Sequence, residues 1–233
     1  VDGVMSGDPR RIPDVAVIPE LSWHEAMELA YFGAKILHPR TVEPARRRNM
    51  KIAIKNTLAP DADGSLITSR SPRPKSIIKS VAYDTDIGIL KVHASGVGAR
   101  RGILGEVASC IAANGINIKS VVTSQTCISL LLTRQDMEPA RQALLGIRPR
   151  PFRKLDRLED VALIGIVGDG IHHRDGIAAR CFSAVADCRV NVEMISFGPS
   201  RAALYFLVKR KDLESGVNAI HSTFFSTPRC SRG

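Results

Sequence analysis

Aromatic side chains are scarce in this chain of 233 residues: they make up 5% of it, whereas hydrophobic residues together reach 44%. Its cores should therefore be aliphatic, built from Ile, Val, Leu and Ala. No run of about 18 apolar residues is present, which argues against a membrane-spanning helix. No basic segment followed by an apolar one marks a secretion signal either.

Cysteine is also sparse and unpatterned, with five residues and no CxxC pair: Cys110, Cys127, Cys181, Cys188 and Cys230. Two of them, Cys181 and Cys188, lie seven positions apart on an expected helix. That spacing separates them by about 10 Å along the helix axis, too far for a disulfide or a shared metal. Such a set fits a reducing compartment, and we expect the cytoplasm.

The charge balance is strongly basic, with a net charge of +10. The arginines are scattered or in small clusters at 46–48 and 148–153, and no aromatic platform alternates with them as in a single-strand binder. We therefore expect solvated helix faces and no nucleic-acid partner. His172 and His173 lie near two aspartates, but a metal needs more converging ligands, and no metal site is predicted.

The first 58 residues are expected to form one mixed α/β unit. Ser22 and Glu25 have the spacing of a capping box, which predicts a helix from Trp23. A second helix is expected over 40–48 and a strand over 51–55. Residues 59–76, with three prolines and several serines, are interpreted as a linker.

From residue 77 onward, β-branched strands alternate with short helices. Strands are expected at 77–83, 87–93, 117–124 and 127–133, and helices from about 102 to Ala113 and near 136–145. Asn114-Gly115 is a helix stop. We assign residues 77–150 to a first module and 158–226 to a second.

The second module repeats the first at a distance of 74 positions. Gly102-Ile103-Leu104 corresponds to Gly176-Ile177-Ala178, and Asn117-Ile118 to Asn191-Val192. Each copy reads as most of a βαββαβ ferredoxin-like unit, in the α+β class. Neither copy shows a clean last strand of its own. The strand within 77–84 is available to complete the second copy, which would interleave the two.

Three stretches resemble the aspartokinase family. Val1–Arg10 (VDGVMSGDPR) is similar to the family segment that closes around the nucleotide, and Phe32–Thr41 (FGAKILHPRT) to its FGAK-x-LHPRT stretch. Lys55–Thr57 with the later Gly64–Ile67 resembles the end of its kinase domain. The repeated module resembles its paired ACT domains, so the likeness covers about residues 1–226.

The resemblance implies an enzyme that transfers the γ-phosphoryl group of ATP, with Mg²⁺, to L-aspartate, giving 4-phospho-L-aspartate at the start of lysine, threonine and methionine biosynthesis. It places Lys35, Arg10 and Met5 at the nucleotide. Phosphoryl transfer depends on positioning and on stabilisation by cations, which Lys and Arg can supply. By itself, Lys35 could equally be a solvated lysine past a helix end. The family's N-terminal phosphate-binding and aspartate-binding segments are not in the sequence. We therefore expect a fragment that does not turn over alone.

The resemblance also implies that the ACT pair senses lysine or threonine. The helix starting near Gly102 offers unpaired N–H groups and a positive dipole end to a ligand carboxylate. The family site maps onto eleven residues: Val97, Ala99, Arg100, Gly102, Ile103, Leu104, Asn117, Ile118, Lys119, Thr123 and Ser124.

Lys119 departs from the family pattern, because sensing relatives often carry an aspartate there that meets the ligand's ammonium. A cation facing a cation costs affinity, and Arg100 adds further positive charge. Either Lys119 points away, a partner neutralises it, or sensing is lost. One hypothesis pairs Lys119 with Glu193, its counterpart in the second module; ordinary exposed charges are the alternative.

Two other interpretations remain open at this point. The chain could be a stand-alone regulatory subunit that binds an amino acid without catalysis, although FGAK-x-LHPRT favours the longer enzyme. Its last eight residues could lead into a fused second enzyme. ACT modules of this size bury little surface alone, so we expect a homo-oligomer.

Overall fold

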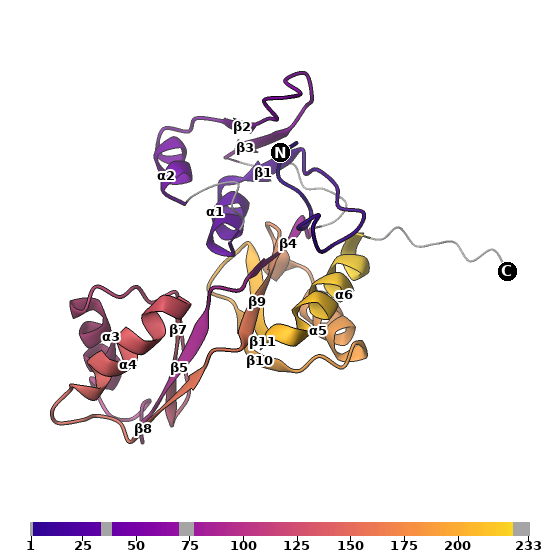
Figure 1. Cartoon of the computed structure of the whole chain (residues 1–233). Helices are drawn as coiled ribbons and strands as arrows, with labels where there is room; N and C mark the ends of the chain where they lie inside the picture. The colour runs from indigo at the N-terminus through magenta and orange to yellow at the C-terminus, as the bar shows by residue number, and fades with distance from the viewer. Residues whose placement is uncertain (1, 34–38, 70–76, 226–233) are drawn as a thin grey trace. The chain divides into compact units, whose positions relative to one another are not determined.

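The computed structural model describes residues 2–33, 39–69 and 77–225, shown in Figure 1. It divides into two compact units, one formed by Val1–Asp84 with Leu163–Gly233 and the other by Thr85–Ala162. The second unit is therefore an insertion within the first along the chain. No helix in the described ranges is long and apolar enough to cross a membrane.

The N-terminal part of the first unit contains a small sheet and two helices. Its elements are β1 (Glu20–Ser22), α1 (Trp23–Tyr31), α2 (Pro39–Arg47), β2 (Ile52–Ile54) and β3 (Ser65–Thr68), with strand order β1-β3-β2. The expected capping box is confirmed, because the Ser22 hydroxyl accepts from the Glu25 N–H and the Glu25 carboxylate accepts from the Ser22 N–H. The helix expected at 40–48 runs one residue earlier. The linker expected over 59–76 is wrong at Ser65–Thr68, which form the middle strand β3 and pair with β1 and β2.

The larger sheet of the first unit is the second module. It has the order β10-β11-β9-β4 and comprises β4 (Ser80–Asp84), β9 (Val161–Val167), β10 (Val192–Phe197) and β11 (Ala203–Lys209). Helices α5 (Ile177–Asp187) and α6 (Leu213–Phe225) belong to it. Strand β4 pairs antiparallel with β9 over its whole length, so the second module is completed by a strand that precedes the first module in the sequence. The interleaved arrangement is therefore confirmed.

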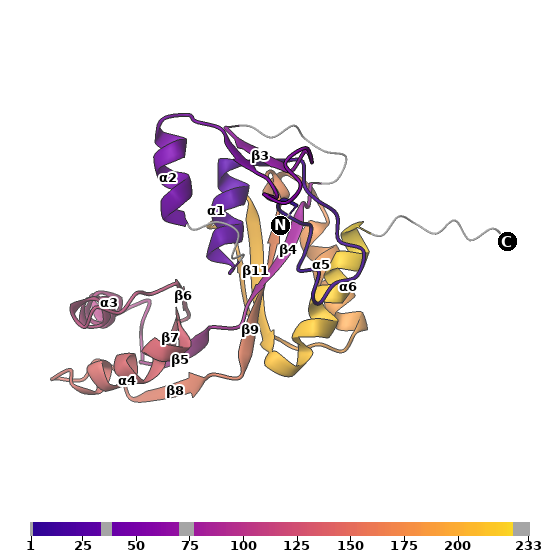
Figure 2. The same cartoon turned by 45° about the horizontal axis from the view of Figure 1, so that its top comes forward.

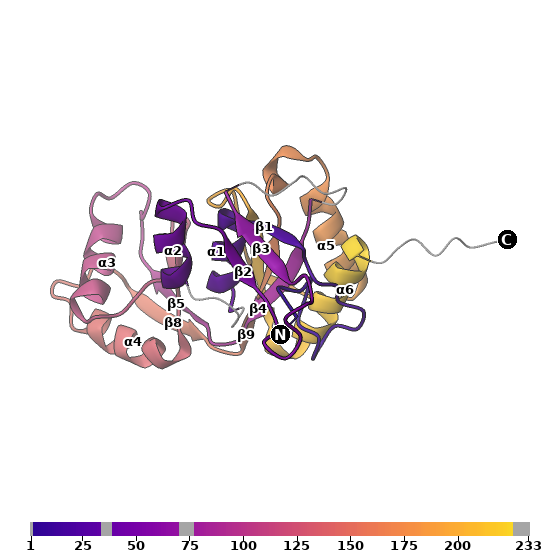
Figure 3. The same ribbon diagram turned by 90° about the horizontal axis from the view of Figure 1, so that it is seen from above.

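Strand β9 is buried along all seven of its residues because this sheet is covered on both faces. Figure 3 shows α5 and α6 beside one face and α1 beside the other. The contact with α1 is made by Phe32, which directly follows the helix and is fully buried. A Cβ on Gly165 of β9 would lie 2.6 Å from the Phe32 ring, so this glycine lets the ring sit on the strand.

The second unit is a complete βαββαβ module, seen clearly in Figure 2. Its elements are β5 (Gly88–His93), α3 (Ile103–Ala113), β6 (Ser120–Thr123), β7 (Cys127–Leu132), α4 (Met137–Leu145) and β8 (Lys154–Leu158), with strand order β6-β7-β5-β8. Alternate residues of β5 and β7, such as Leu90 and Leu130, form one aliphatic core with α3 and α4. The expected scarcity of aromatic side chains in the cores holds here.

Strand β8 corrects the expectation that the first module lacks a last strand of its own. It pairs antiparallel with β5 and lies beyond residue 150, the expected end of the module. Its residues, KLDRL, have no buried position. The strand is at the sheet edge, where charged side chains are common, and this hid it from a hydrophobic pattern.

The 74-residue repeat is present in the structure as well. Helices α3 and α5 have the same length and begin 74 positions apart, each after a left-handed glycine: Gly102 with φ 91° and Gly176 with φ 79°. The last helices, α4 and α6, begin at Met137 and Leu213, 76 positions apart. The second copy is therefore two residues longer, and the extra residues lie in the turn between its second and third strands: five residues, 198–202, separate β10 from β11, whereas three, 124–126, separate β6 from β7.

Candidate functional site

Two of the three residues expected at the nucleotide are in the described part of the chain. Met5 is half-buried, forms a β-bridge with Val17, and its carbonyl accepts a hydrogen bond from the Ser80 hydroxyl at 2.9 Å. Arg10 has a side chain that is 77% exposed and pairs with Asp8. Lys35 lies outside the described residues.

The guanidinium of Arg10 is held by Asp8 through two hydrogen bonds, from Nε at 3.0 Å and from Nη2 at 2.7 Å. The Tyr83 hydroxyl donates to the same carboxylate at 2.6 Å. The bonds from Arg10, and then the bond from Tyr83, hold the pKa of Asp8 well below its usual range despite its partial burial. The carboxylate therefore remains charged at neutral pH and fixes the arginine.

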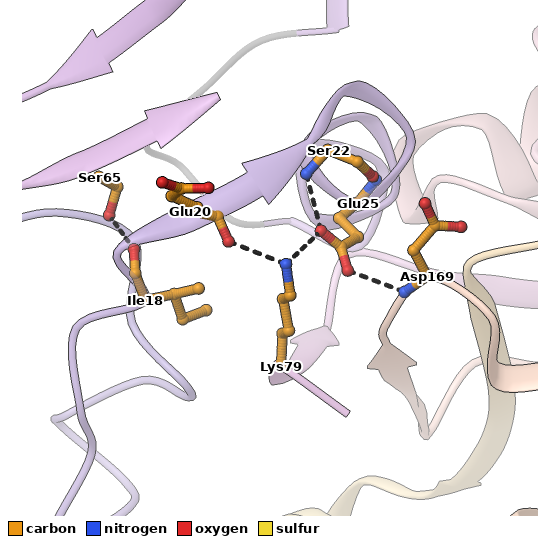
Figure 4. A network of polar contacts seen from close by, with 7 residues as sticks. All are labelled: Ile18, Glu20, Ser22, Glu25, Ser65, Lys79 and Asp169. Carbon is orange, nitrogen blue, oxygen red and sulfur yellow. Dashed lines mark hydrogen bonds and ion pairs between the residues drawn. The ribbon is translucent and has the colours of Figure 1, made fainter. Parts of the chain in front are cut away.

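Helix α1 carries a buried ion pair that joins the N-terminal part of the first unit to the second module (Figure 4). The Glu25 carboxylate, fully buried, contacts the Lys79 ammonium at 2.9 Å and accepts from the backbone N–H of Asp169 at 2.8 Å. The ammonium also donates to the Glu20 carbonyl at 2.9 Å. Every group of this pair is satisfied, as buried charges require.

Further along the same face of α1, Glu28 extends this junction. Its carboxylate accepts from the Ser200 hydroxyl at 2.5 Å, and burial raises the pKa of Glu28. Glu25, Glu28 and Phe32 are spaced three and four residues apart, and so form one stripe on the helix. This stripe meets the β9–α5 loop, the β10–β11 turn and the sheet face of the second module.

The expected amino-acid site lies in the first module, around the glycine-rich turn before α3. The turn is joined to the β6–β7 connection, since the Val97 N–H donates to the Gln125 carbonyl at 3.0 Å. Gly102 caps α3 without a side-chain hydrogen bond, and the first N–H groups of a helix have no partner within it. The structure thus places the glycine-rich turn that leads into α3 beside the residues that follow β6.

The eleven expected residues differ in exposure: three pack in or against the core, one is half-buried and seven are exposed. Ile103 is fully buried, and Val97 and Ile118 pack against the aliphatic core, so these three can offer a ligand backbone groups but little side chain. Lys119 is half-buried, and its N–H donates to the Leu131 carbonyl at 2.9 Å. The remaining seven are exposed: Ala99, Arg100, Gly102, Leu104, Asn117, Thr123 and Ser124.

The equivalent space in the second module is occupied by the protein's own side chains. The His172 ring stacks on Phe197 at 4.2 Å, and its Nε2 lies against the Ser200 carbonyl. His172 is thereby engaged in packing. Among the residues that the structure describes, no three His, Cys, Asp or Glu side chains gather as a metal site would require.

The pairing of Lys119 with Glu193 stays a prediction, because the two residues belong to different units. Asp8, Tyr83, Glu25 and Lys79 were missed as site residues by sequence reasoning. Glu25 gave a signal, but only as half of a capping box. The other contacts join residues 54 to 144 positions apart, which local patterns do not reveal.

Two protein families match separate parts of the first unit. Residues 1–56 match the amino acid kinase family, and residues 164–224 match the ACT domain. The chain is 31% identical, over 98% of its length, to the bifunctional aspartokinase/homoserine dehydrogenase of Haemophilus influenzae, and 32% identical, over 97%, to chloroplastic aspartokinase 1 of Arabidopsis thaliana. It spans 29% and 41% of these relatives.

Solved structures show the same likeness. E. coli aspartokinase III in complex with aspartate and ADP has a TM-score of 0.86 at 28% identity, covering 97% of this chain and 51% of that one. The same enzyme in complex with lysine and aspartate gives 0.81 at 28% identity, covering 97% and 50%. The regulatory subunit of Thermus thermophilus aspartate kinase, at 22% identity and a TM-score of 0.58, covers 63% of this chain and 99% of its own, and shows the fold alone.

The chain thus joins the end of an amino acid kinase domain to ACT regulatory modules. Over this region it belongs to the aspartokinase family: residues 1–56 form the C-terminal end of the kinase domain, and the βαββαβ modules are its ACT regulatory part.

Proposed function

We propose that this chain is the regulatory part of an aspartate kinase, in which the first ACT module binds lysine or threonine and the second passes the signal to the kinase domain. The whole enzyme would phosphorylate L-aspartate with ATP to 4-phospho-L-aspartate. The observation that carries the proposal is the likeness to E. coli aspartokinase III, whose structures hold aspartate with ADP and lysine with aspartate.

In this proposal, Met5, Arg10 and Lys35 approach the ATP. A Mg²⁺ ion would supply charge neutralisation at the phosphates. The chain by itself is expected not to turn over, and ATP-dependent formation of aspartyl hydroxamate measures this.

The amino acid's carboxylate would meet the N-terminus of α3, and its ammonium the backbone and side chains from Asn117 to Ser124. Isothermal titration with lysine, threonine and methionine tests this directly. Heat of binding from lysine or threonine supports amino acid sensing by the first module. No heat from any of the three, with a protein that is folded, contradicts it.

A matched pair of glycine variants tests whether the turn before α3 contacts the ligand. Gly102 and Gly115 stand at the two ends of α3, both with positive φ and with no atom near an added Cβ. Both alanine variants therefore carry a similar backbone strain. Gly102→Ala should weaken binding at least tenfold because it shifts the ligand-facing turn, while Gly115→Ala should bind as the parent does. Equal affinities in the two variants would place the ligand elsewhere.

A stand-alone regulatory subunit is the second candidate, since the Thermus thermophilus subunit is covered over 99% of its length. The two candidates differ in what residues 2–69 do. If they belong to a kinase, amino acid binding should change amide exchange in segment 5–10. A pure sensor would leave that segment unchanged.

We also infer that the protein assembles through its ACT modules in the cytoplasm. Strands β6 and β10 are sheet edges, and each exposes large apolar side chains: Val121, Ile195 and Phe197. Light scattering behind a sizing column should give a dimer or larger. A monomer at all concentrations would contradict the assembly.

A further inference from the structure

Strand β4 holds the segment assigned to the nucleotide along the edge that does not pair with β9. The Ser80 hydroxyl donates to the Met5 carbonyl, and the Val81 N–H donates to the Ser6 carbonyl, both at 2.9 Å. The third contact is the Tyr83 hydroxyl, which reaches Asp8. The segment 5–8 is therefore fastened to a strand of the ACT region at three successive places.

The third contact differs from the other two because it ends on a charged, partly exposed pair. One carboxylate oxygen of Asp8 accepts a hydrogen bond from Arg10 Nε. The other accepts from both Arg10 Nη2 and the Tyr83 hydroxyl. Arg11 donates from Nε to the Tyr83 oxygen at 3.1 Å, and its guanidinium lies 5.2 Å from the ring centre. Burial, followed by the bond to Asp8, raises the pKa of Tyr83, so the hydroxyl remains a donor at neutral pH.

The same end of β4 also faces the turn that leads from α1 toward Lys35. Gly33 has φ +86°, and a Cβ on it would lie 3.1 Å from the Tyr83 carbonyl oxygen and 3.6 Å from the Asp84 side chain. One residue after Asp84, the chain enters the first ACT module. Tyr83 thus lies on the module's connecting strand, between the segment 5–8 and the turn at Gly33.

We propose that Tyr83 is a positioning residue for Arg10, fixing the Asp8 carboxylate that holds the arginine and tying it to the strand that enters the first ACT module. A movement of β4 on amino acid binding would then shift the Arg10 side chain through Tyr83 and Asp8. This rests on the proposed function, in which Arg10 meets the nucleotide.

The test uses the side-chain Nε–Hε signal of Arg10 in the ¹⁵N-labelled full chain, assigned with Arg10→Lys. Tyr83→Phe removes only the hydroxyl and keeps the ring under Arg11. Exchange of the Arg10 Hε with water at pH 7 should become about threefold to tenfold faster, the factor expected for loss of one hydrogen bond to the supporting carboxylate. Asp8→Asn sets the upper limit, with a larger acceleration.

Tyr205→Phe is the matched control, since it removes a tyrosine hydroxyl from the same sheet, and the Tyr205 ring packs near Phe32. Its Arg10 exchange should equal that of the parent. If Tyr83→Phe also equals the parent, Tyr83 does not position Arg10 and the inference is overturned.

The coupling is tested by titrating lysine and threonine while following both heat and the Arg10 signal. The expected result is that the signal moves in the parent and stays still in Tyr83→Phe, although the amino acid still binds. Binding without movement in the parent overturns the coupling and leaves sensing intact. If neither amino acid binds, the sensing function fails, and the exchange comparison alone decides the role of Tyr83.

Discussion

Replacing Glu25 with glutamine tests how firmly the second ACT module is fastened to the end of the kinase domain. The carboxylate accepts from three donors: the Ser22 N–H at 2.7 Å, the Lys79 ammonium at 2.9 Å and the Asp169 N–H at 2.8 Å. Glutamine keeps the shape, but it removes the charge and turns one acceptor into a donor. At least one of the three donors is then left without an acceptor, and the Lys79 ammonium, 6% exposed, loses its counter-ion.

Breaking a buried, hydrogen-bonded ion pair from one side costs about 3–5 kcal/mol, a large part of the 5–15 kcal/mol that typically stabilises a protein. With an m value of about 2 kcal/mol/M in urea, the unfolding midpoint should fall by about 1.5–2.5 M. Lys79→Met should cost less than Glu25→Gln, because the Glu25 carboxylate keeps two backbone donors. The double variant should cost about 1–3 kcal/mol less than the sum of the two.

Fluorescence of Trp23 is the suitable readout, since it is the single tryptophan and lies buried on α1 two residues from Glu25. It follows the first unit even if the second unfolds separately. Glu43→Gln, which removes an exposed pair with Arg46 and Arg47 on α2, is the control and should leave the midpoint unchanged. A Glu25→Gln midpoint equal to that of the control would refute the reasoning. Should Glu25→Gln not fold, Lys79→Met and the double variant carry the comparison.

Three further outcomes are expected in the first unit. Gly165→Ala should cost about 1–3 kcal/mol, since its Cβ would press on the Phe32 ring; thermal unfolding followed by Trp23 fluorescence checks this, and an unchanged melting temperature would show that the ring yields freely. Gly168→Ala should be worse, because its Cβ would lie 1.9 Å from the Ile77 carbonyl oxygen, and an equal loss in the two variants would contradict this order. His221, bonded to Ser6, has a pKa lowered by burial, so its unfolded form gains a proton first as the pH falls. Stability should therefore be full above about pH 6.5 and decline below it, and in urea unfolding at pH 7.5 and 5.5 the decline should be smaller in His221→Gln.

Much of the fold could be predicted from local patterns. The capping box at Ser22 and Glu25 set the start of α1. Glycines 102 and 176 marked the starts of α3 and α5, because left-handed caps favour glycine. The candidate nucleotide and amino-acid sites came instead from resemblance to a family. The sequence pattern did not predict strand β8, because at a sheet edge a charged segment pairs as well as an apolar one.

The sequence by itself determined the aliphatic cores, the repeated helix–strand order and the resemblance to aspartokinases, because these follow from composition, periodicity and short motifs. Only the tertiary structure decided that β4 pairs with β9, that Glu25 meets Lys79 and Asp169, and that Tyr83 reaches Asp8. When distant segments pack together, their buried polar groups need hydrogen-bond partners, and this need determines which residues pair. That requirement acts in space and leaves no periodic trace along the chain.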